Sequence, residues 1–326
     1  MEPTVPSKFR LPSIFLAFLS AVAISGCSDS NDSHSESTNL YALEGSCPDN
    51  FIAKAGGNSG FMSDGGSRQF HVFLPETLDT PRPLFIALTG TMATELEFVS
   101  DDISRFESLV DSGWIVVAPI RRCTSENRSC FGIGLKGSND GRFWEPWFDG
   151  WMSQSNDEGP DVRFIEAMVS CLAASFPVDK NRIYNGGGSA GGTMTSRNMM
   201  FNSDLFAGGI SASGNFLYLS QLPIEPLDAI TMDPSIVVIL WGGPEDKFGT
   251  SDYSVETKLS SEYYAAQANV VTVSCSGIHG HPWPNNFGLW AAETVLSHPK
   301  GTPVADFVLT TPPKGFSCVR GVYTDH

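Results

Sequence analysis

Short, continuously apolar runs that alternate with helical stretches are the feature that most constrains how this chain folds. Residues 84–88, 114–118 and 236–241 form three such runs, and uninterrupted apolar sequence is typical of strands buried on both faces. Residues 161–176 instead place apolar side chains at steps of three and four, on one helical face. Strands joined by crossover helices pair in parallel. The pattern therefore predicts an α/β fold, a mostly parallel sheet with helices on both faces.

The remaining expected elements follow the same alternation. Further strands are expected at residues 70–74, 182–185, 207–212 and 270–275. Further helices are expected at residues 95–110, 192–201, 256–268 and 287–296. Asp161 is the expected N-cap of the helix at 161–176. Residues 123–160 fit neither periodicity and are rich in Gly, Trp, Phe, Asn and Asp, which indicates a long insertion over the sheet.

The first residues indicate export. Lys8 and Arg10 precede an apolar stretch, residues 11–24, that is shorter than the roughly 20 residues needed to span a bilayer. This arrangement predicts a secretory signal peptide. The stretch ends in Ile-Ser-Gly-Cys27, which resembles the lipobox of bacterial lipoproteins, in which the cysteine becomes lipidated. An ordinary signal peptide with a chance cysteine is the alternative.

These signals divide the chain into three predicted parts. Residues 1–26 are the signal peptide with its lipobox, residues 27–45 are a polar, flexible tether, and residues 46–326 are a single α/β domain. We expect the mature protein to be anchored through lipid on Cys27 to a bacterial membrane, on the periplasmic or outer-membrane face. In Gram-negative lipoproteins, an Asp directly after the lipidated cysteine resembles an inner-membrane retention signal. This chain has Ser28 at that position, which favours the outer membrane as the destination.

Composition narrows the possible partners. The chain has 36 acidic and 20 basic residues, a net charge of −16. Nucleic-acid sites are built from clustered Lys and Arg, so no nucleic-acid partner is expected. No C-x-x-C pair occurs, which argues against zinc, and we expect neither a metal nor a cofactor.

Besides Cys27, the chain has six cysteines. An even number of cysteines in an oxidising compartment predicts disulfides. Six thiols allow 15 complete pairings, so the connectivity stays open. Proximity suggests only that Cys123 pairs with Cys130, across a polar loop.

One G-x-S-x-G sequence, residues 187–191, lies between the strand at 182–185 and the helix at 192–201. This is the context of a nucleophile elbow, a sharp turn that lifts a serine hydroxyl above the sheet in a strained backbone conformation. We therefore predict Ser189 as a nucleophile and the Ala190 N–H as an oxyanion donor. A glycine-rich turn with a capping serine is the alternative.

A serine nucleophile needs a base, and in this architecture the chain order is serine, acid, histidine. His279 and His281 lie in the loop after the strand at 270–275, which is the expected place. His298 and His326 lie near or beyond the last expected helix. The general base is therefore expected to be either His279 or His281.

The orienting acid is expected just past the end of the strand at 236–241, where a carboxylate can reach an imidazole. Asp246 is the preferred candidate. Glu245 is its near rival, and Asp252 and Asp233 are weaker alternatives.

Four segments resemble the polyhydroxybutyrate depolymerase and feruloyl esterase branch of the α/β-hydrolases. GHPWP at residues 280–284 resembles the G-H-x-W-P of that family, which implies His281 as the catalytic histidine. GPED at residues 243–246 resembles its acid turn and supports Asp246. DKNRIYNGGGSAGG at residues 179–192 resembles its strand and elbow.

The fourth segment, PLFIALTGT at residues 83–91, resembles the strand that leads to the oxyanion turn of the family. Thr89 stands where the family usually has histidine. The backbone N–H of Thr91 is the second oxyanion donor that the resemblance implies, because a backbone donor depends little on its side chain.

The function expected from these residues is ester hydrolysis through a Ser-His-Asp triad and an acyl-enzyme, on polyhydroxyalkanoate-type, feruloyl or acetyl esters. Polymeric esters are among the expected substrates, and four aromatic residues are expected to contact them: Trp144, Trp147, Trp151 and Trp283. The first three lie in the insertion, where they could equally pin a long loop to the body. The alternatives are a serine peptidase on the same fold and a non-catalytic lipoprotein that binds a polymer or sugar.

Overall fold

A mixed sheet forms the centre of the computed structural model, which describes residues 43, 45–63, 66–90, 95–100, 103–120, 159–214, 233–248 and 251–323. Nine strands of the described residues build it, in the order β1-β2-β4-β3-β5-β6-β7-β10-β11. They are β1 (Gly56–Ser63), β2 (Gly66–Phe73), β3 (Arg82–Leu88), β4 (Ile115–Ile120), β5 (Val178–Gly188), β6 (Gly208–Ala212), β7 (Ser235–Trp241), β10 (Val270–Ser276) and β11 (Ser317–Arg320). A separate two-stranded ribbon pairs β8 (Lys247–Phe248) with β9 (Ser251–Asp252).

The strands β4, β3, β5, β6, β7 and β10 pair in parallel. The outer strands β1, β2 and β11 pair antiparallel to their neighbours. The expected α/β-hydrolase fold with a mostly parallel sheet is therefore confirmed.

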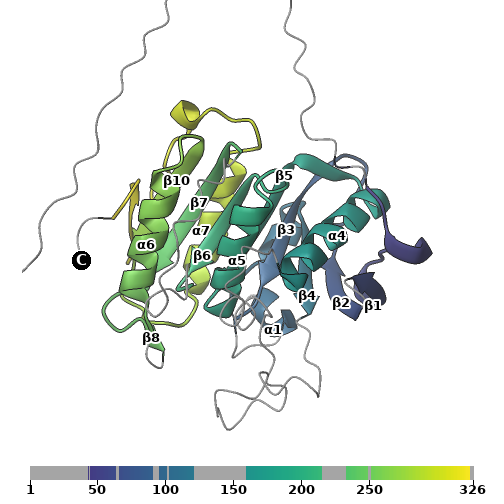
Figure 1. The fold of residues 1–326 in the computed structure, drawn as a ribbon, viewed down its shortest axis with the longest axis horizontal. Coiled ribbons are helices and arrows are strands. Elements are labelled where there is room, and N and C mark those ends of the chain that lie inside the picture. Colours follow the sequence, from purple (N-terminus) through teal and green to yellow (C-terminus); the bar gives the residue numbers. More distant parts are fainter. Residues whose placement is uncertain are drawn as a thin grey trace, which may run out of the picture. The chain divides into compact units, whose positions relative to one another are not determined.

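Helices cover both faces of this sheet. They are α1 (Glu95–Val99), α2 (Glu107–Asp111), α4 (Pro160–Ser175), α5 (Ala190–Phe201), α6 (Tyr253–Ala265) and α7 (Asn285–Leu296). Figure 1 shows α4, α5 and α6 in front of the sheet and α7 behind it. Strand β3 is apolar throughout because its side chains alternate between two cores, one on each face of the sheet. The core under α4 and α5 contains Leu84, Ile86 and Leu88. The core under α1, α2 and α7 contains Phe85 and Ala87.

Two of the helix predictions are wrong in detail. The helix expected at 95–110 is two short helices, α1 and α2, because Arg105 has a φ of +62° and ends helical geometry between them. Just before α2, the Ser104 hydroxyl accepts a hydrogen bond from the Phe106 N–H. Asp161 is not an N-cap: α4 begins at Pro160, and Asp161 is fully buried in an ion pair with Arg68.

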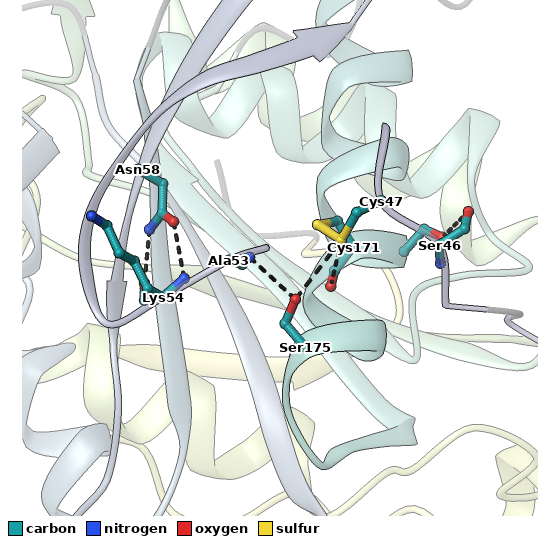
Figure 2. Close-up of a disulfide and its surroundings, with 8 residues drawn as sticks. Ser46, Cys47, Ala53, Lys54, Asn58, Cys171 and Ser175 are labelled. Atoms are coloured by element: carbon teal, nitrogen blue, oxygen red, sulfur yellow. Dashed lines mark hydrogen bonds between the residues drawn. A yellow bond between two sulfur atoms is a disulfide. The ribbon is translucent and has the colours of Figure 1, made fainter. Parts of the chain in front are cut away.

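Two disulfides fasten the ends of the described domain. Cys275 on β10 pairs with Cys318 on β11, directly across the antiparallel register. Cys47, at the start of a 3₁₀ turn (η1, Pro48–Asn50), pairs with Cys171 on α4. Figure 2 shows this second disulfide beside Ser175, whose hydroxyl accepts the Ala53 N–H at 3.2 Å. Disulfides persist in oxidising compartments, as expected of an exported protein.

Several sequence predictions lie outside the described residues: the signal peptide, most of the tether with Cys27, almost all of the insertion at 123–160, and the cysteines Cys123 and Cys130. The described residues all fall in one compact unit, residues 41–326. Among the described helices we find none with the length and apolarity needed to cross a bilayer.

Candidate active site

Ser189 lies at the turn between β5 and α5, at the carboxyl edge of the sheet. Its φ of +55° and ψ of −123° place it in a conformation that costs a non-glycine residue energy. Two backbone hydrogen bonds hold the turn: the Ser189 N–H donates to Ala212 O at 2.9 Å, and the Thr193 N–H donates to Ser189 O at 3.0 Å. The serine is thus fixed on a strained turn, as a nucleophile elbow requires.

The glycines around Ser189 are required by close packing. A Cβ on Gly187 would lie 2.0 Å from Leu88 O, and one on Gly191 would lie 1.9 Å from the same atom. Both distances are far below van der Waals contact, so the end of β3 can approach the elbow only because these positions lack side chains. This close approach brings Gly90, after β3, within reach of Ser189: a Cβ on Gly90 would be 3.3 Å from Ser189 Cβ.

Three side chains from three separate loops form one hydrogen-bonded chain. The Ser189 hydroxyl donates to His281 Nε2 at 2.9 Å, and His281 Nδ1–H donates to Asp246 Oδ1 at 2.9 Å. Asp246 is fully buried. His281 keeps 19% of its side-chain surface, so the imidazole is reachable by substrate and the carboxylate is not.

The loops that carry Asp246 and His281 are hydrogen-bonded to each other. The Gly280 N–H donates to Gly242 O at 2.8 Å. A Cβ on Gly242 would lie 1.8 Å from Gly280 O, so this contact is possible only with glycine. The imidazole also stacks on the Tyr253 ring, with centroids 4.6 Å apart and planes 25° apart.

The other acid candidates lie elsewhere. Glu245 is exposed. Asp252 caps α6 by accepting the Ser254 N–H at 3.1 Å, and the Ser254 hydroxyl hydrogen bond is the main cause that lowers the pKa of Asp252. The Asp233 N–H donates to Ser203. None of these three carboxylates hydrogen-bonds to His281 in the described residues.

The other histidine candidates are also placed apart from Ser189. His279 Nδ1–H donates to Pro282 O at 2.9 Å, and burial lowers the pKa of His279. His298 is fully buried after α7, and burial lowers its pKa. His326 lies outside the described residues.

An apolar cavity of about 140 Å³ opens beside Ser189. Its lining includes Phe98, Phe248 and Trp283 as well as Ser189 and His281. Trp283 packs edge-on against Phe98, with ring centroids 5.3 Å apart, and covers Gly188, whose Cβ would lie 2.8 Å from the indole. Trp283 is therefore a wall of this cavity, whereas Trp144, Trp147 and Trp151 lie outside the described residues.

The expected oxyanion donors are only partly described. Ala190 is the first residue of α5, directly after Ser189, where the helix N-terminus leaves backbone N–H groups without helical partners. Thr91 lies outside the described residues. Thr89, the departure from the family pattern, is fully buried before Gly90, and Gly90 lines the cavity.

Two residues at this site were missed by sequence reasoning. Ser213 donates a hydrogen bond to Asp246 Oδ2 at 2.7 Å, and Tyr253 stacks on the imidazole. Ser213 directly follows the strand expected at 207–212, at the same sheet edge as Ser189. That position is a signal that could have identified it.

Comparisons with known proteins agree with this geometry. The prolyl oligopeptidase family matches at residues 144–230, which include Ser189. An oxidized polyvinyl alcohol hydrolase of Sphingopyxis sp. (strain 113P3) is 35% identical over 338 residues, covering 89% of this chain and 92% of the relative. A second, from Pseudomonas sp., is 32% identical over 333 residues, covering 85% and 86%.

A solved structure, native sOPH, superposes with a TM-score of 0.73 at 35% identity, covering 87% of this chain and 99% of that one. The prediction of a serine ester hydrolase is therefore confirmed. The chain belongs to the family of the oxidized polyvinyl alcohol hydrolases, serine hydrolases with the α/β-hydrolase fold.

Proposed function

We propose that this enzyme cleaves acyl groups from an oxidised, uncharged polymer of the poly(vinyl alcohol) kind, through an acyl-enzyme on Ser189. The single observation that carries the proposal is the Ser189–His281–Asp246 chain, with both hydrogen bonds at 2.9 Å. The names of the 35% and 32% identical relatives supply the substrate class.

The geometry supports a role for each side chain in this reaction. Ser189 Oγ attacks the carbonyl carbon while His281 Nε2 takes its proton. Asp246 accepts the hydrogen bond from Nδ1–H and stabilises the imidazolium that forms. The N–H groups of Ala190 and Thr91 would hold the oxyanion, a contribution of roughly 3 kcal/mol per donor. Water, deprotonated by His281, then releases the carboxylic acid.

The same machinery serves two kinds of acyl bond. In an ester, the leaving alkoxide takes the proton from His281. Oxidation of neighbouring alcohols in poly(vinyl alcohol) yields 1,3-diketones. Attack on one ketone breaks the adjacent C–C bond, and the departing enolate takes the proton instead. The sum is diketone plus water giving one carboxylic acid and one methyl ketone.

The cavity supports an uncharged, mainly hydrocarbon substrate. Phe98, Phe248 and Trp283 line it, and His281 is the one titratable side chain among its described lining residues. Its volume of about 140 Å³ is close to that of a protein cavity that binds benzene. A short segment of polymer backbone would fit there. The substrate contacts expected of Trp144, Trp147 and Trp151 stay predictions, because these residues lie outside the described part of the chain.

Active-site labelling combined with a substrate panel tests the proposal. A fluorophosphonate probe should label the wild type and not Ser189→Ala. The His281→Ala variant should lose at least about 10³-fold in kcat. The panel contains a 1,3-diketone, p-nitrophenyl butyrate, a feruloyl ester, a 3-hydroxybutyrate oligomer and a peptide amide. Turnover of the diketone and butyrate supports the proposal; preferred turnover of the amide would favour a peptidase instead.

The lipid anchor is a second part of the proposal. The lipobox-like sequence before Cys27 and the polar residues after it support a mature protein tethered to a membrane. Metabolic labelling with a radioactive fatty acid should mark the wild type and leave Cys27→Ala unlabelled. Equal labelling of both proteins would contradict the anchor without affecting the catalytic proposal.

A further inference from the structure

The carboxylate of Asp246 is held by more than the imidazole. Oδ1 accepts His281 Nδ1–H, whereas Oδ2 accepts two other hydrogen bonds, each of 2.7 Å, from the Gly242 N–H and the Ser213 hydroxyl. The side chain has no exposed surface, so these donors replace the hydration that burial removes. Two donors on Oδ2 also fix the plane of the carboxylate, and with it the direction in which Oδ1 faces the histidine.

Ser213 occupies a backbone position that would suit glycine better. Its φ is +47°, in the left-handed region that is unfavourable for residues with a Cβ. Its N–H donates to Leu240 O at 2.9 Å, which joins the end of β6 to β7. Strained non-glycine positions cluster at functional sites, and the bond to Asp246 is a reason for a side chain to be present here.

We propose that Ser213 is a positioning residue of the hydrolytic reaction: its hydroxyl orients Asp246 so that the carboxylate directs His281 toward Ser189. This inference rests on the proposed roles of those three residues. Ser213 belongs to the cavity lining, but only 2% of its surface is exposed and its hydroxyl donates to Asp246. Its loss should therefore lower kcat and leave KM within about twofold.

Two substitutions separate positioning from stability. Ser213→Ala removes the hydroxyl, and Ser213→Gly removes it while also relieving the positive φ. Both should lower kcat about 10-fold, the effect of losing one hydrogen bond to a charged group. Ser213→Gly should nevertheless melt at or above the temperature of Ser213→Ala. Ser274→Ala is the matched control, because this buried β10 serine bonds to Ser261 and Gly321 and not to Asp246.

A double-mutant cycle then shows whether Ser213 acts through Asp246. In an Asp246→Ala background, Ser213→Ala should cause no further loss of kcat, since the carboxylate that it positions is gone. An unchanged kcat in both Ser213 variants, or an equal loss in the Asp246→Ala background, would overturn the inference. Retained activity in Ser189→Ala would instead overturn the proposed function, so the two failures are distinguishable.

Discussion

Two serines at the proposed active site share an unusual backbone conformation. Ser189 and Ser213 each directly follow a parallel strand, and each has a positive φ, +55° and +47°. Each N–H is also tied to a neighbouring strand, at Ala212 O and Leu240 O, by a 2.9 Å hydrogen bond. These bonds offset local strain that is of order 1–3 kcal/mol per residue. The two hydroxyls thereby form the ends of one hydrogen-bond chain, which runs from Ser189 through His281 and Asp246 to Ser213.

A buried histidine makes stability depend on pH. His298 has no exposed surface, and neither ring nitrogen has a hydrogen-bond partner among the described residues. Burial, followed by the nearby positive charge of Arg320, lowers the pKa of His298 below its usual 6.5. At pH values between the lowered pKa of His298 and 6.5, the histidine is protonated more often in the unfolded chain than in the folded one. The contribution of His298 to the free energy of unfolding should therefore be constant above about pH 6.5 and fall as the pH decreases below it.

Replacing His298 with leucine should reduce the decrease in the free energy of unfolding at low pH. Urea unfolding of the wild type and of His298→Leu is measured at pH 8 and at pH 5. The difference between the two proteins at pH 8 reports packing alone, because the histidine is neutral there. The fall from pH 8 to pH 5 should be smaller in the variant, although His71 and His279, whose pKa values burial also lowers, preserve part of it. An identical fall in both proteins would show that His298 does not contribute.

At the scale of elements, three strands of one sheet bring together the proposed catalytic residues. Ser189, Asp246 and His281 lie in loops that follow β5, β7 and β10, and parallel strands end at the same edge. Among these strands, β7 is a continuous apolar run, β10 is rich in valine, and β5 is expected from the sequence only at residues 182–185, before the glycine cluster. Local pattern therefore predicts the strands and the loops just past them, whereas the choice of His281 over His279 comes from the family resemblance.

The elements that the sequence did not reveal have weak local patterns. β1 (GGNSGFMS) is glycine-rich and largely exposed, and its place at the sheet edge depends on pairing with β2. β11 is four residues long and is held to β10 by the Cys275–Cys318 disulfide. The position of Ser213 at the sheet edge could be predicted, but its hydrogen bond could not, because its partner Asp246 is 33 residues further along the chain. Contacts between distant segments are absent from any single sequence window.

The two disulfides should stabilise the fold unequally. Cys47 and Cys171 are 124 residues apart, whereas Cys275 and Cys318 are 43 residues apart. Loop-closure entropy favours the longer loop by about 1 kcal/mol, within a usual range of about 2–5 kcal/mol for one disulfide. The Cys47–Cys171 bond also fastens the N-terminal segment to α4, whereas the other bond joins an edge strand to its neighbour (Figure 1).

Thermal and urea unfolding of the two double Cys→Ser variants measure this difference. The variant without Cys47–Cys171 should lose more stability than the variant without Cys275–Cys318. Single Cys→Ser variants are poor controls because each leaves a free thiol, so each pair is removed together. A larger loss on removing Cys275–Cys318 would mean that the edge strand, rather than the N-terminal segment, limits stability.

At the scale of the whole molecule, an apolar cavity opens in a strongly acidic protein. The net charge of −16 creates a negative potential over much of the surface. An uncharged polymer approaches such a protein without penalty, and a carboxylate product is repelled after hydrolysis. The acidic composition and the neutral cavity lining are thus both compatible with a polymer that becomes charged only when it is cut.

This charge predicts discrimination between two acyl groups of equal length. p-Nitrophenyl butyrate and p-nitrophenyl hemisuccinate both carry a four-carbon acyl chain, but only the second is anionic. In about 0.01 M salt, where the Debye length is about 30 Å, kcat/KM for the hemisuccinate should be several-fold lower than for the butyrate. In about 0.15 M salt, where the Debye length is about 8 Å, that gap should narrow. The butyrate rate serves as the control and should stay constant. A gap that does not depend on salt would place the discrimination in the apolar cavity wall around Trp283 instead of in the field of the whole protein.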